Sequence, residues 1–223
     1  MFSVRTIVLT DMLRRHSRRP DQPPAPGATP VEAASEPLVA SRAFPKFLSA
    51  LAGRDHLTII DVGPAIGPNL TFFSELTACK FYVEDLYAEL ERHARAGTRA
   101  ELATLLPGRI QEPDASVDAI LCWDIFDFLD KPAAQALARE FVRVLRPGGA
   151  LLGLFANAQG TQTHYTRFVI ADATHFRHRK SPATTVPRQV IPNRDIIRLF
   201  DGLLVSDSYL LLTHTREIVF RKR

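Results

Sequence analysis

Apolar and polar stretches alternate along the chain in a way that predicts strands separated by helices. Short apolar runs rich in β-branched and aromatic residues indicate strands, and apolar positions three and four residues apart indicate helices. The predicted strands are residues 57–62, 80–86, 118–123 and 150–156. The predicted helices are residues 41–53, 70–77, 87–95 and 133–145. Strands joined by helices of this length form right-handed crossovers, so a parallel sheet is expected.

The C-terminal part of the chain has a different pattern. Residues 157–193 are polar, carry three prolines and show little periodicity. A short helix is predicted at residues 195–200, and two extended runs, 203–212 and 217–223, predict an antiparallel closing hairpin. The fold class is therefore α/β, a doubly wound and mostly parallel Rossmann-like sheet with helices on both faces and an antiparallel C-terminal hairpin. A third strand is expected within residues 96–116, although that stretch looks more helical than extended.

The first predicted strand ends in an acid and runs into a loop that suits a small polar ligand. Asp61 closes the strand, and Gly63 and Gly67 follow it four residues apart. Glycines let backbone N–H groups approach a ligand closely at the start of a helix. Asn69 is a candidate N-cap for that helix. An ordinary strand-to-helix turn is the alternative, since glycines are common in such turns.

The second predicted strand ends in two acids, Glu84 and Asp85. Asp85 follows Asp61 by 24 residues. In a doubly wound sheet, an acid at the tip of the second strand can accept both hydroxyl groups of a ribose. The alternative role for Asp85 is the N-cap of the next helix, and the two roles are compatible.

Three stretches together resemble the class I S-adenosylmethionine-dependent methyltransferases. The first is Asp61-x-Gly63-x-Ala65-x-Gly67 followed by the second-strand acid, with Ala65 where the family usually has a glycine. The others are the fourth-strand segment 117–124 and the segment 145–152, which contains Leu-Arg-Pro-Gly-Gly. The resemblance implies that S-adenosylmethionine is the cofactor. The cofactor-binding residues that it implies are Asp61, Gly63, Pro64, Ala65, Gly67, Asn69, Asp85, Leu86 and Trp123.

The resemblance leaves the methyl acceptor open. Many members of the family that act on small molecules place a histidine where this chain has Phe128. The catalytic candidates are Asp124, which follows the fourth strand, and His164 and Tyr165, which follow the fifth. Their alternative roles are an N-cap for residues 125–129 and a solvated surface loop. The expected function is methyl transfer to an unidentified acceptor of the small-molecule type.

Two other functions compete with methyl transfer. A methyltransferase-like binding module without turnover would explain the departures at Ala65 and Phe128. A nicotinamide-dependent oxidoreductase is disfavoured, because the loop lacks the Gly-x-Gly-x-x-Gly pattern. No constellation of acids of the kind that holds a divalent metal is present in the sequence, and no metal is predicted.

Composition divides the chain into three parts. Residues 1–19 carry five arginines and one acid, and a disordered basic head is predicted there. Residues 20–37 are rich in proline and alanine and are predicted to be a linker, whereas residues 38–223 form the methyltransferase-like domain. The formal net charge of +4 lies in the head, so nucleic acid is not an expected partner.

Location is predicted from the apolar runs and the cysteines. The apolar run in the head is three residues long, too short for a signal peptide or a membrane span. The two cysteines, Cys79 and Cys122, form no metal-binding pattern and are expected to be buried free thiols. These features predict a cytoplasmic protein without membrane attachment. No feature of the sequence predicts an oligomeric state.

Overall fold

The computed structural model describes residues 6–10, 36–64, 66–158, 164–184 and 186–223. Within those residues, no helix is both long and apolar enough to cross a membrane. The elements are β1 (Thr6–Thr10), β2 (Leu38–Ala40), α1 (Phe44–Leu51), β3 (His56–Asp61), α2 (Gly67–Leu76), β4 (Ala78–Val83), α3 (Leu86–Ala96), η1 (Arg99–Glu101), α4 (Leu102–Leu105), η2 (Pro107–Arg109), β5 (Val117–Trp123), η3 (Ile125–Phe128), α5 (Lys131–Val144), β6 (Leu145–Ala156), β7 (His164–Ile170), β8 (His175–Ala183), α6 (Asn193–Leu199), β9 (Leu203–Leu210) and β10 (Thr215–Lys222).

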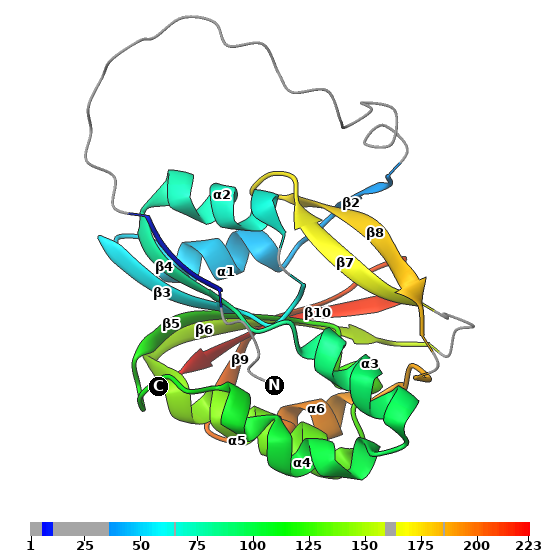
Figure 1. Ribbon diagram of the computed structural model, residues 1–223. Coiled ribbons are helices and arrows are strands. Elements are labelled where there is room, and N and C mark those ends of the chain that lie inside the picture. The colour runs from blue at the N-terminus through cyan, green and yellow to red at the C-terminus, as the bar shows by residue number, and fades with distance from the viewer. Residues whose placement is uncertain (1–5, 11–35, 65, 159–163, 185) are drawn as a thin grey trace, which may run out of the picture.

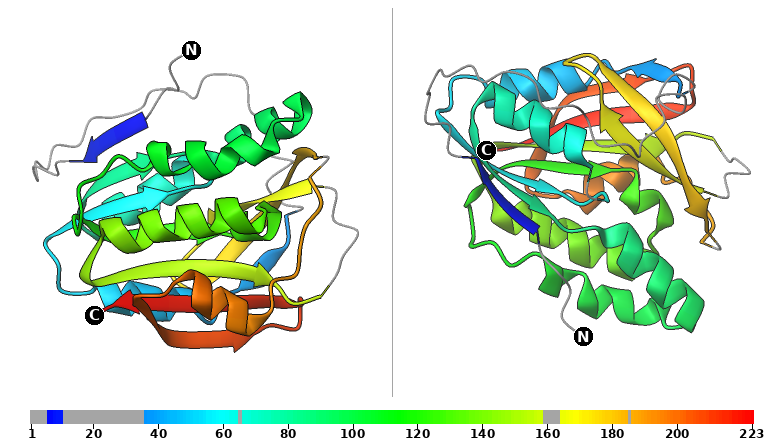
Figure 2. Two further views of the ribbon diagram at one scale, coloured as in Figure 1. Left: turned by 90° about the horizontal axis from the view of Figure 1, so that it is seen from below. Right: turned by 45° about the horizontal axis from the view of Figure 1, so that its top comes forward.

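A seven-stranded sheet forms the centre of the molecule, in the order β1-β4-β3-β5-β6-β10-β9 (Figure 1). Strands β4, β3, β5 and β6 are parallel, whereas β10 runs antiparallel to both β6 and β9. Helices α1 and α2 cover one face, and α3 to α6 cover the other (Figures 1 and 2). The predicted α/β class, the mostly parallel sheet and the closing hairpin are therefore confirmed.

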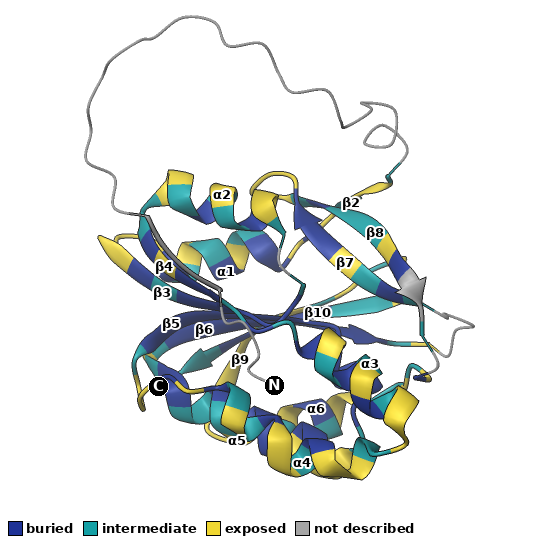
Figure 3. Ribbon diagram, viewed as in Figure 1, coloured by how far each residue is buried: buried dark blue, intermediate teal, exposed yellow. Residues whose placement is uncertain are grey.

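Alternation along the strands divides the apolar residues between two cores. Ile60 of β3 belongs to the core beneath α3, α5 and α6, whereas Leu57 and Ile59 belong to the core beneath α1 and α2. Successive side chains of a strand point to opposite faces, so a strand covered on both sides is apolar throughout. All seven residues of β5 are accordingly buried, and Figure 3 shows β5 and the neighbouring β6 in dark blue at the centre of the sheet.

The edge of the sheet beside β4 differs from what the sequence predicts. Residues 96–116, where a third strand is expected, form the end of α3 and the short helices η1, α4 and η2. Strand β1 instead pairs with β4, antiparallel, with Thr6 opposite Val83 and Thr10 opposite Cys79. The prediction of a disordered head is therefore wrong for residues 6–10, and the rest of the head and most of the linker lie outside the described residues. The short apolar run in the head supplies the strand that residues 96–116 do not form.

A second sheet arises from a segment in which the sequence shows little periodicity. Strands β7 and β8 form an antiparallel hairpin within residues 157–193, and β2 pairs with β8. This small sheet, β2-β8-β7, lies on the same side of the large sheet as α1 and α2 (Figure 1). The inner positions of the small sheet, Phe168, Ile170 and Phe176, belong to the core beneath those two helices.

The backbone conformation of the Leu-Arg-Pro-Gly-Gly stretch explains its two glycines. It forms the irregular start of β6, where the pairing with β5 slips between Val117 and Ala119. Gly148 has a φ of 73°, a conformation that glycine adopts without a steric cost. A Cβ atom on Gly149 would lie 2.9 Å from the carbonyl oxygen of Arg146, so only glycine fits there. Arg146 itself forms an ion pair with the buried Asp118 at the opposite end of β5 from Trp123.

Candidate cofactor-binding site

Three parallel strands bring the predicted site residues to one edge of the sheet. Asp61 ends β3, Asp85 follows β4 and Trp123 ends β5. Since the carboxyl ends of parallel strands meet at the same edge, these side chains lie at neighbouring strand tips. Gly63 follows Asp61 in the loop that leads to α2. The order of the strands thus assembles the residues that the sequence singles out.

The Asp61 carboxylate is the hydrogen-bonding centre of this edge. Its Oδ1 atom accepts hydrogen bonds from the backbone N–H of Gly63, at 2.8 Å, and from the indole Nε1 of Trp123, at 2.6 Å. Its Oδ2 atom accepts a hydrogen bond from Asn69 Nδ2 at 3.3 Å. Asp61 therefore links the loop, the tip of β5 and the first turn of α2.

Burial raises the pKa of Asp61 from 3.8 to about 6. The hydrogen bonds from Trp123, Gly63 and Asn69 lower the pKa, and the nearby negative charge of Asp85 raises it. Desolvation of the carboxylate therefore raises the pKa by more than the three hydrogen bonds lower it.

Trp123 closes the space above Gly63. A φ of 46° turns the backbone of Trp123 into the left-handed region at the end of β5, an uncommon conformation for a bulky residue. The indole stacks on the ring of Phe168 from β7, with 5.3 Å between the ring centres and 8° between the planes. A Cβ atom on Gly63 would lie 3.0 Å from two indole atoms. Strained residues of this kind concentrate at functional sites.

The sequence-based role of Asn69 as an N-cap is wrong. Helix α2 begins at Gly67, and its N-cap residue is Ile66, which makes no side-chain capping bond. The buried Asn69 amide instead donates to the carbonyl oxygen of Phe168 at 3.0 Å, and its Oδ1 accepts from the N–H of Ile170 at 2.8 Å. Asn69 therefore fastens β7 to Asp61, and its polar atoms bind within the protein.

The N-terminus of α2 has the features of a site for a carboxylate or other anion. No side chain caps this end of the helix, and a Cβ atom on Gly67 would meet nothing within 4 Å. Pro68 has no N–H and the N–H of Asn69 donates to the carbonyl oxygen of Ile66, so the N–H of Gly67 and the helix dipole are the groups that favour an anion there. Pro64 is partly exposed beside this opening, and Ala65 lies outside the described residues. This end of the helix can therefore hold an anionic group of a ligand.

The two acids after β4 point in different directions, as strand alternation predicts. Asp85 is partly exposed, and its Oδ1 accepts from the N–H of Ala88, so it is the N-cap of α3. Burial raises its pKa, while the bond from Ala88 and the charges of Arg167 and Arg109 lower it. Glu84 is buried and paired with Arg109 at 3.3 Å. Of the two acids, Asp85 is the one that is available to a ligand.

The side chain of Leu86 points away from this opening. It is fully buried in the core beneath α3 and α5. Its backbone N–H also donates to the carbonyl oxygen of Val62. Leu86 therefore stabilises the site from within the core, and neither its side chain nor its backbone N–H faces a ligand.

Asp124 belongs to a buried charged network behind the tip of β5. Its Oδ1 accepts from the Tyr87 hydroxyl at 2.6 Å, and its Oδ2 lies 3.4 Å from Arg188 Nη2. Arg188 Nε also donates to Asp127 Oδ2 at 2.8 Å. Burial raises the pKa of both acids, that of Asp127 to about 7, and the charge of Arg188 opposes the rise. Asp124 makes no capping bond to η3, so its predicted alternative role is wrong.

The two other catalytic candidates lie at the start of β7. Tyr165 is buried, donates to Glu91 Oε2 at 3.2 Å and packs edge-to-face against Tyr87. Burial raises the pKa of its phenol, which therefore stays protonated near neutral pH. His164 is partly exposed at the start of the strand. Tyr165 also packs against Phe128 of η3, and its neighbour Tyr87 bonds Asp124, so Tyr165 lies beside the buried network after β5.

Four residues of the site edge were not predicted from the sequence. Phe168 and Arg188 lie in the segment that shows little periodicity. Asp127 lies within residues 125–129, which were given no role of their own, and Tyr87 lies at the start of the helix predicted at residues 87–95. Their roles arise from tertiary contacts between distant segments. A signal for Arg188 was present, because a single arginine between two prolines in an otherwise uncharged stretch is unusual.

Comparison with known proteins identifies the fold. Residues 59–149, from β3 to the start of β6, match the family model described as a methyltransferase domain. An S-adenosylmethionine-dependent methyltransferase from Mesorhizobium loti is 14% identical, with a TM-score of 0.53, over 82% of this chain and 98% of that chain. The 1,6-didemethyltoxoflavin-N1-methyltransferase of Burkholderia thailandensis is 16% identical, with a TM-score of 0.50, over 81% and 77%.

A further structural neighbour is longer than this chain. The pyocyanin biosynthetic protein PhzM is 18% identical with a TM-score of 0.44, and this chain spans only 54% of its length. No curated protein matches the chain in sequence.

The fold and the family match agree with the strand-tip residues. Residues 59–149 match a methyltransferase domain, and the chain shares the fold of an S-adenosylmethionine-dependent methyltransferase. The resemblance carried by Asp61, Gly63 and the Leu-Arg-Pro-Gly-Gly stretch is thereby confirmed.

The raised pKa of Asp61 gives a pH dependence that Asp61→Asn removes. The folded protein binds the Asp61 proton more tightly than the unfolded chain does, so this contribution to stability is greatest below pH 4 and is lost as the pH rises through about 6. Between pH 4 and pH 7, the unfolding free energy of the wild type should fall by about 2.4 kcal/mol relative to that of the variant, because the unfolded carboxyl is already more than half ionised at pH 4. Urea unfolding of both proteins at the two pH values measures the difference. Parallel pH profiles would contradict the assignment.

Proposed function

We propose that this protein transfers the methyl group of S-adenosylmethionine to a small-molecule acceptor. The observation that supports this most is the convergence of Asp61, Gly63, Asp85 and Trp123 at three adjacent strand tips. When bound, S-adenosylmethionine supplies an electrophilic methyl group on a sulfonium. The protein then has to bind the cofactor, orient it and exclude water.

Each end of the cofactor has a matching group on the protein. The uncapped N-terminus of α2, beside the open Gly67, suits the carboxylate. The Asp85 carboxylate suits the ribose hydroxyls, and its Oδ1 keeps the N-cap bond to Ala88. The buried Asp61 holds Gly63 and Trp123 in place between these two ends.

The surroundings of the strand tips favour a small acceptor. The hairpin β7–β8 packs over this edge, with Phe168 stacked on Trp123, and so limits access to the tips. Residues 20–223 carry as many acids as lysines and arginines, a poor basis for nucleic-acid binding. The Burkholderia neighbour holds 1,6-didemethyltoxoflavin and S-adenosylhomocysteine, a small acceptor and the demethylated cofactor.

Asp124 is proposed as a positioning residue for the acceptor side. It holds the Tyr87 hydroxyl and the Arg188 guanidinium behind Trp123. Asp124 and Asp127 are both buried. The network therefore sets the polarity of the protein interior behind Trp123 and does not contact solvent through these two acids. We also propose a cytoplasmic location, because Cys79 and Cys122 are free thiols of the kind that persist in a reducing compartment.

Label transfer tests the reaction and the size of the acceptor together. The protein is incubated with methyl-labelled S-adenosylmethionine and either the low-molecular-weight filtrate or the macromolecular fraction of a cell extract. We expect label in products of the filtrate and none in the macromolecular fraction. Label in protein or nucleic acid would contradict the small-molecule acceptor. Tight cofactor binding with no label transfer to either fraction would favour the binding module instead.

Replacing Asp85 by serine separates ribose binding from helix capping. Serine is also a good N-cap but is too short to reach a ribose, so Asp85→Ser should weaken cofactor binding by about 1.5–3 kcal/mol, roughly ten- to 150-fold in Kd. Calorimetric titration with S-adenosylhomocysteine measures this.

Asp130 provides the matched control. It caps α5 through Ala133 N at 3.0 Å, as Asp85 caps α3. Asp130→Ser should change the melting temperature as much as Asp85→Ser does and leave cofactor affinity at the wild-type value. If the wild type, Asp85→Ser and Asp130→Ser all bind S-adenosylhomocysteine with the same affinity, Asp85 does not bind the cofactor.

A further inference from the structure

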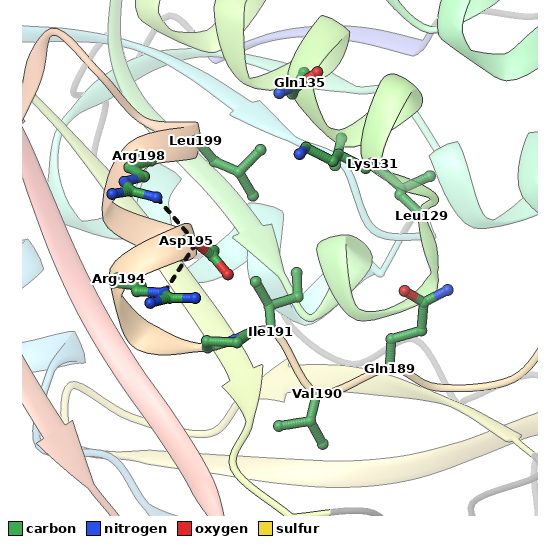
Figure 4. Close-up of a pocket in the computed structure, with 12 residues that line it drawn as sticks. Leu129, Lys131, Gln135, Gln189, Val190, Ile191, Arg194, Asp195, Arg198 and Leu199 are labelled. Carbon is green, nitrogen blue, oxygen red and sulfur yellow. Dashed lines mark ion pairs between the residues drawn. The ribbon is translucent and has the colours of Figure 1, made fainter.

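A pocket of about 520 Å³ lies between α5 and α6, away from the predicted cofactor residues (Figure 4). Its size falls in the range of small-molecule sites, about 300–1,000 Å³. The lining residues come from the start of α5, the end of the loop after η3, the segment 189–192 and α6. They are Leu129, Lys131, Ala134, Gln135, Gln189, Val190, Ile191, Pro192, Arg194, Asp195, Arg198 and Leu199.

The inner wall of the pocket is apolar. Leu129 and Ala134, both nearly fully buried, form its base, and the partly buried Ile191 and Leu199 flank it. Such a surface binds the hydrocarbon or aromatic body of a ligand, because burying it removes apolar area from water.

The rim of the pocket is cationic. Lys131, Arg194 and Arg198 surround it, and Asp195 is the one acid among the lining residues. Both guanidiniums lie near the same Asp195 oxygen, at 3.5 and 3.7 Å, so one carboxylate faces two positive charges (Figure 4). The side chains of Arg194 and Arg198 are 78% and 77% exposed, and they can therefore turn toward an incoming anion.

A second hollow lies beside the pocket, along α5. It has a volume of about 350 Å³ and shares Gln135, Arg198 and Leu199 with the pocket. Arg139 adds another cation to its lining, and Asp201 adds an acid. Arg139 and Asp201 balance each other, so the excess of positive charge lies at the rim of the pocket itself, where it favours the approach of an anion.

The pocket wall is joined to the buried network behind Trp123. Gln189 donates its backbone N–H to the carbonyl oxygen of Asp127 at 2.6 Å. Its neighbour Arg188 holds the carboxylates of Asp124 and Asp127. Leu129, which also lines the pocket, is two residues beyond Asp127. The pocket is thus connected through its lining to the network after β5.

We propose that this pocket binds a small organic anion, a carboxylate, sulfonate or phosphate monoester that carries an apolar body. The apolar base takes the body of the ligand, and Arg194, Arg198 and Lys131 take its charged group. This site does not include any of the residues assigned to the cofactor, and the proposal holds whether or not the protein transfers methyl groups.

Anilinonaphthalene sulfonate is a suitable probe, because it combines an aromatic body with one negative charge and fluoresces in apolar surroundings. Titration of the full-length folded protein should give saturable fluorescence. Phenylnaphthylamine, which lacks the sulfonate, should bind at least about tenfold more weakly, since it leaves the cationic rim unused. Equal binding of the two dyes would overturn the proposal.

Two substitutions at the pocket test its position. Arg198→Glu reverses a rim charge and should weaken the anionic dye by about tenfold or more. Gln135→Trp places a large ring at the exposed rim and should block both dyes without touching the core. Lys46→Glu makes the same charge change on the exposed side of α1, across the large sheet, and should leave dye binding unchanged.

The cofactor site is the competing location for the dye. Saturating S-adenosylhomocysteine should leave the bound dye in place. Displacement of the dye by S-adenosylhomocysteine, or wild-type dye affinity in both Arg198→Glu and Gln135→Trp, would place the dye elsewhere and overturn the proposal. Unchanged melting temperatures of the variants show that any lost binding does not come from unfolding.

Discussion

The candidate site depends on one buried carboxylate, Asp61. A carboxylate out of water is costly unless donors surround it, and here the donors come from three different elements. Trp123 donates from the tip of β5, Gly63 donates from the loop after β3, and Asn69 donates from the first turn of α2. Asn69 then holds the backbone of β7, so the small sheet is positioned by the same group. Removing Asp61 would leave the donors from all three elements without their common acceptor.

The parallel part of the fold was predictable because its strands and helices have strong periodic patterns. Strands β3 to β6 and helices α3 and α5 lie within a few residues of their predicted positions, apart from the early start of β6. The small sheet was not predictable, since β8 is rich in arginine, histidine and lysine, and Phe176 is the one buried apolar residue among those of β8 whose burial is described. Strand β1 was missed for a related reason: its five residues gain order only by pairing with the free edge of β4.

Site residues were predictable where their role depends on their position at the end of a strand. They were not predictable where their role depends on a contact with a segment that is distant in the sequence. Asp61, Gly63 and Asp85 follow directly from the alternation of strands and loops. Asn69 was predicted as a cap because local sequence does not show that β7 lies beside it. Asp124 was recognised, but its partners Tyr87 and Arg188 are 37 and 64 positions away, and only the fold brings them together. The same separation conceals the pocket between α5 and α6.

The single tryptophan of the chain offers the most direct measurement, because Trp123 is bonded to Asp61 at the centre of the site. Its fluorescence is recorded while the folded protein is titrated with S-adenosylhomocysteine, and calorimetry under the same conditions gives an independent Kd. The account predicts a saturable change in the emission of Trp123, with a midpoint that matches the calorimetric Kd. Calorimetric binding without any change in emission would place the cofactor elsewhere, and the absence of binding by both methods would contradict the cofactor assignment.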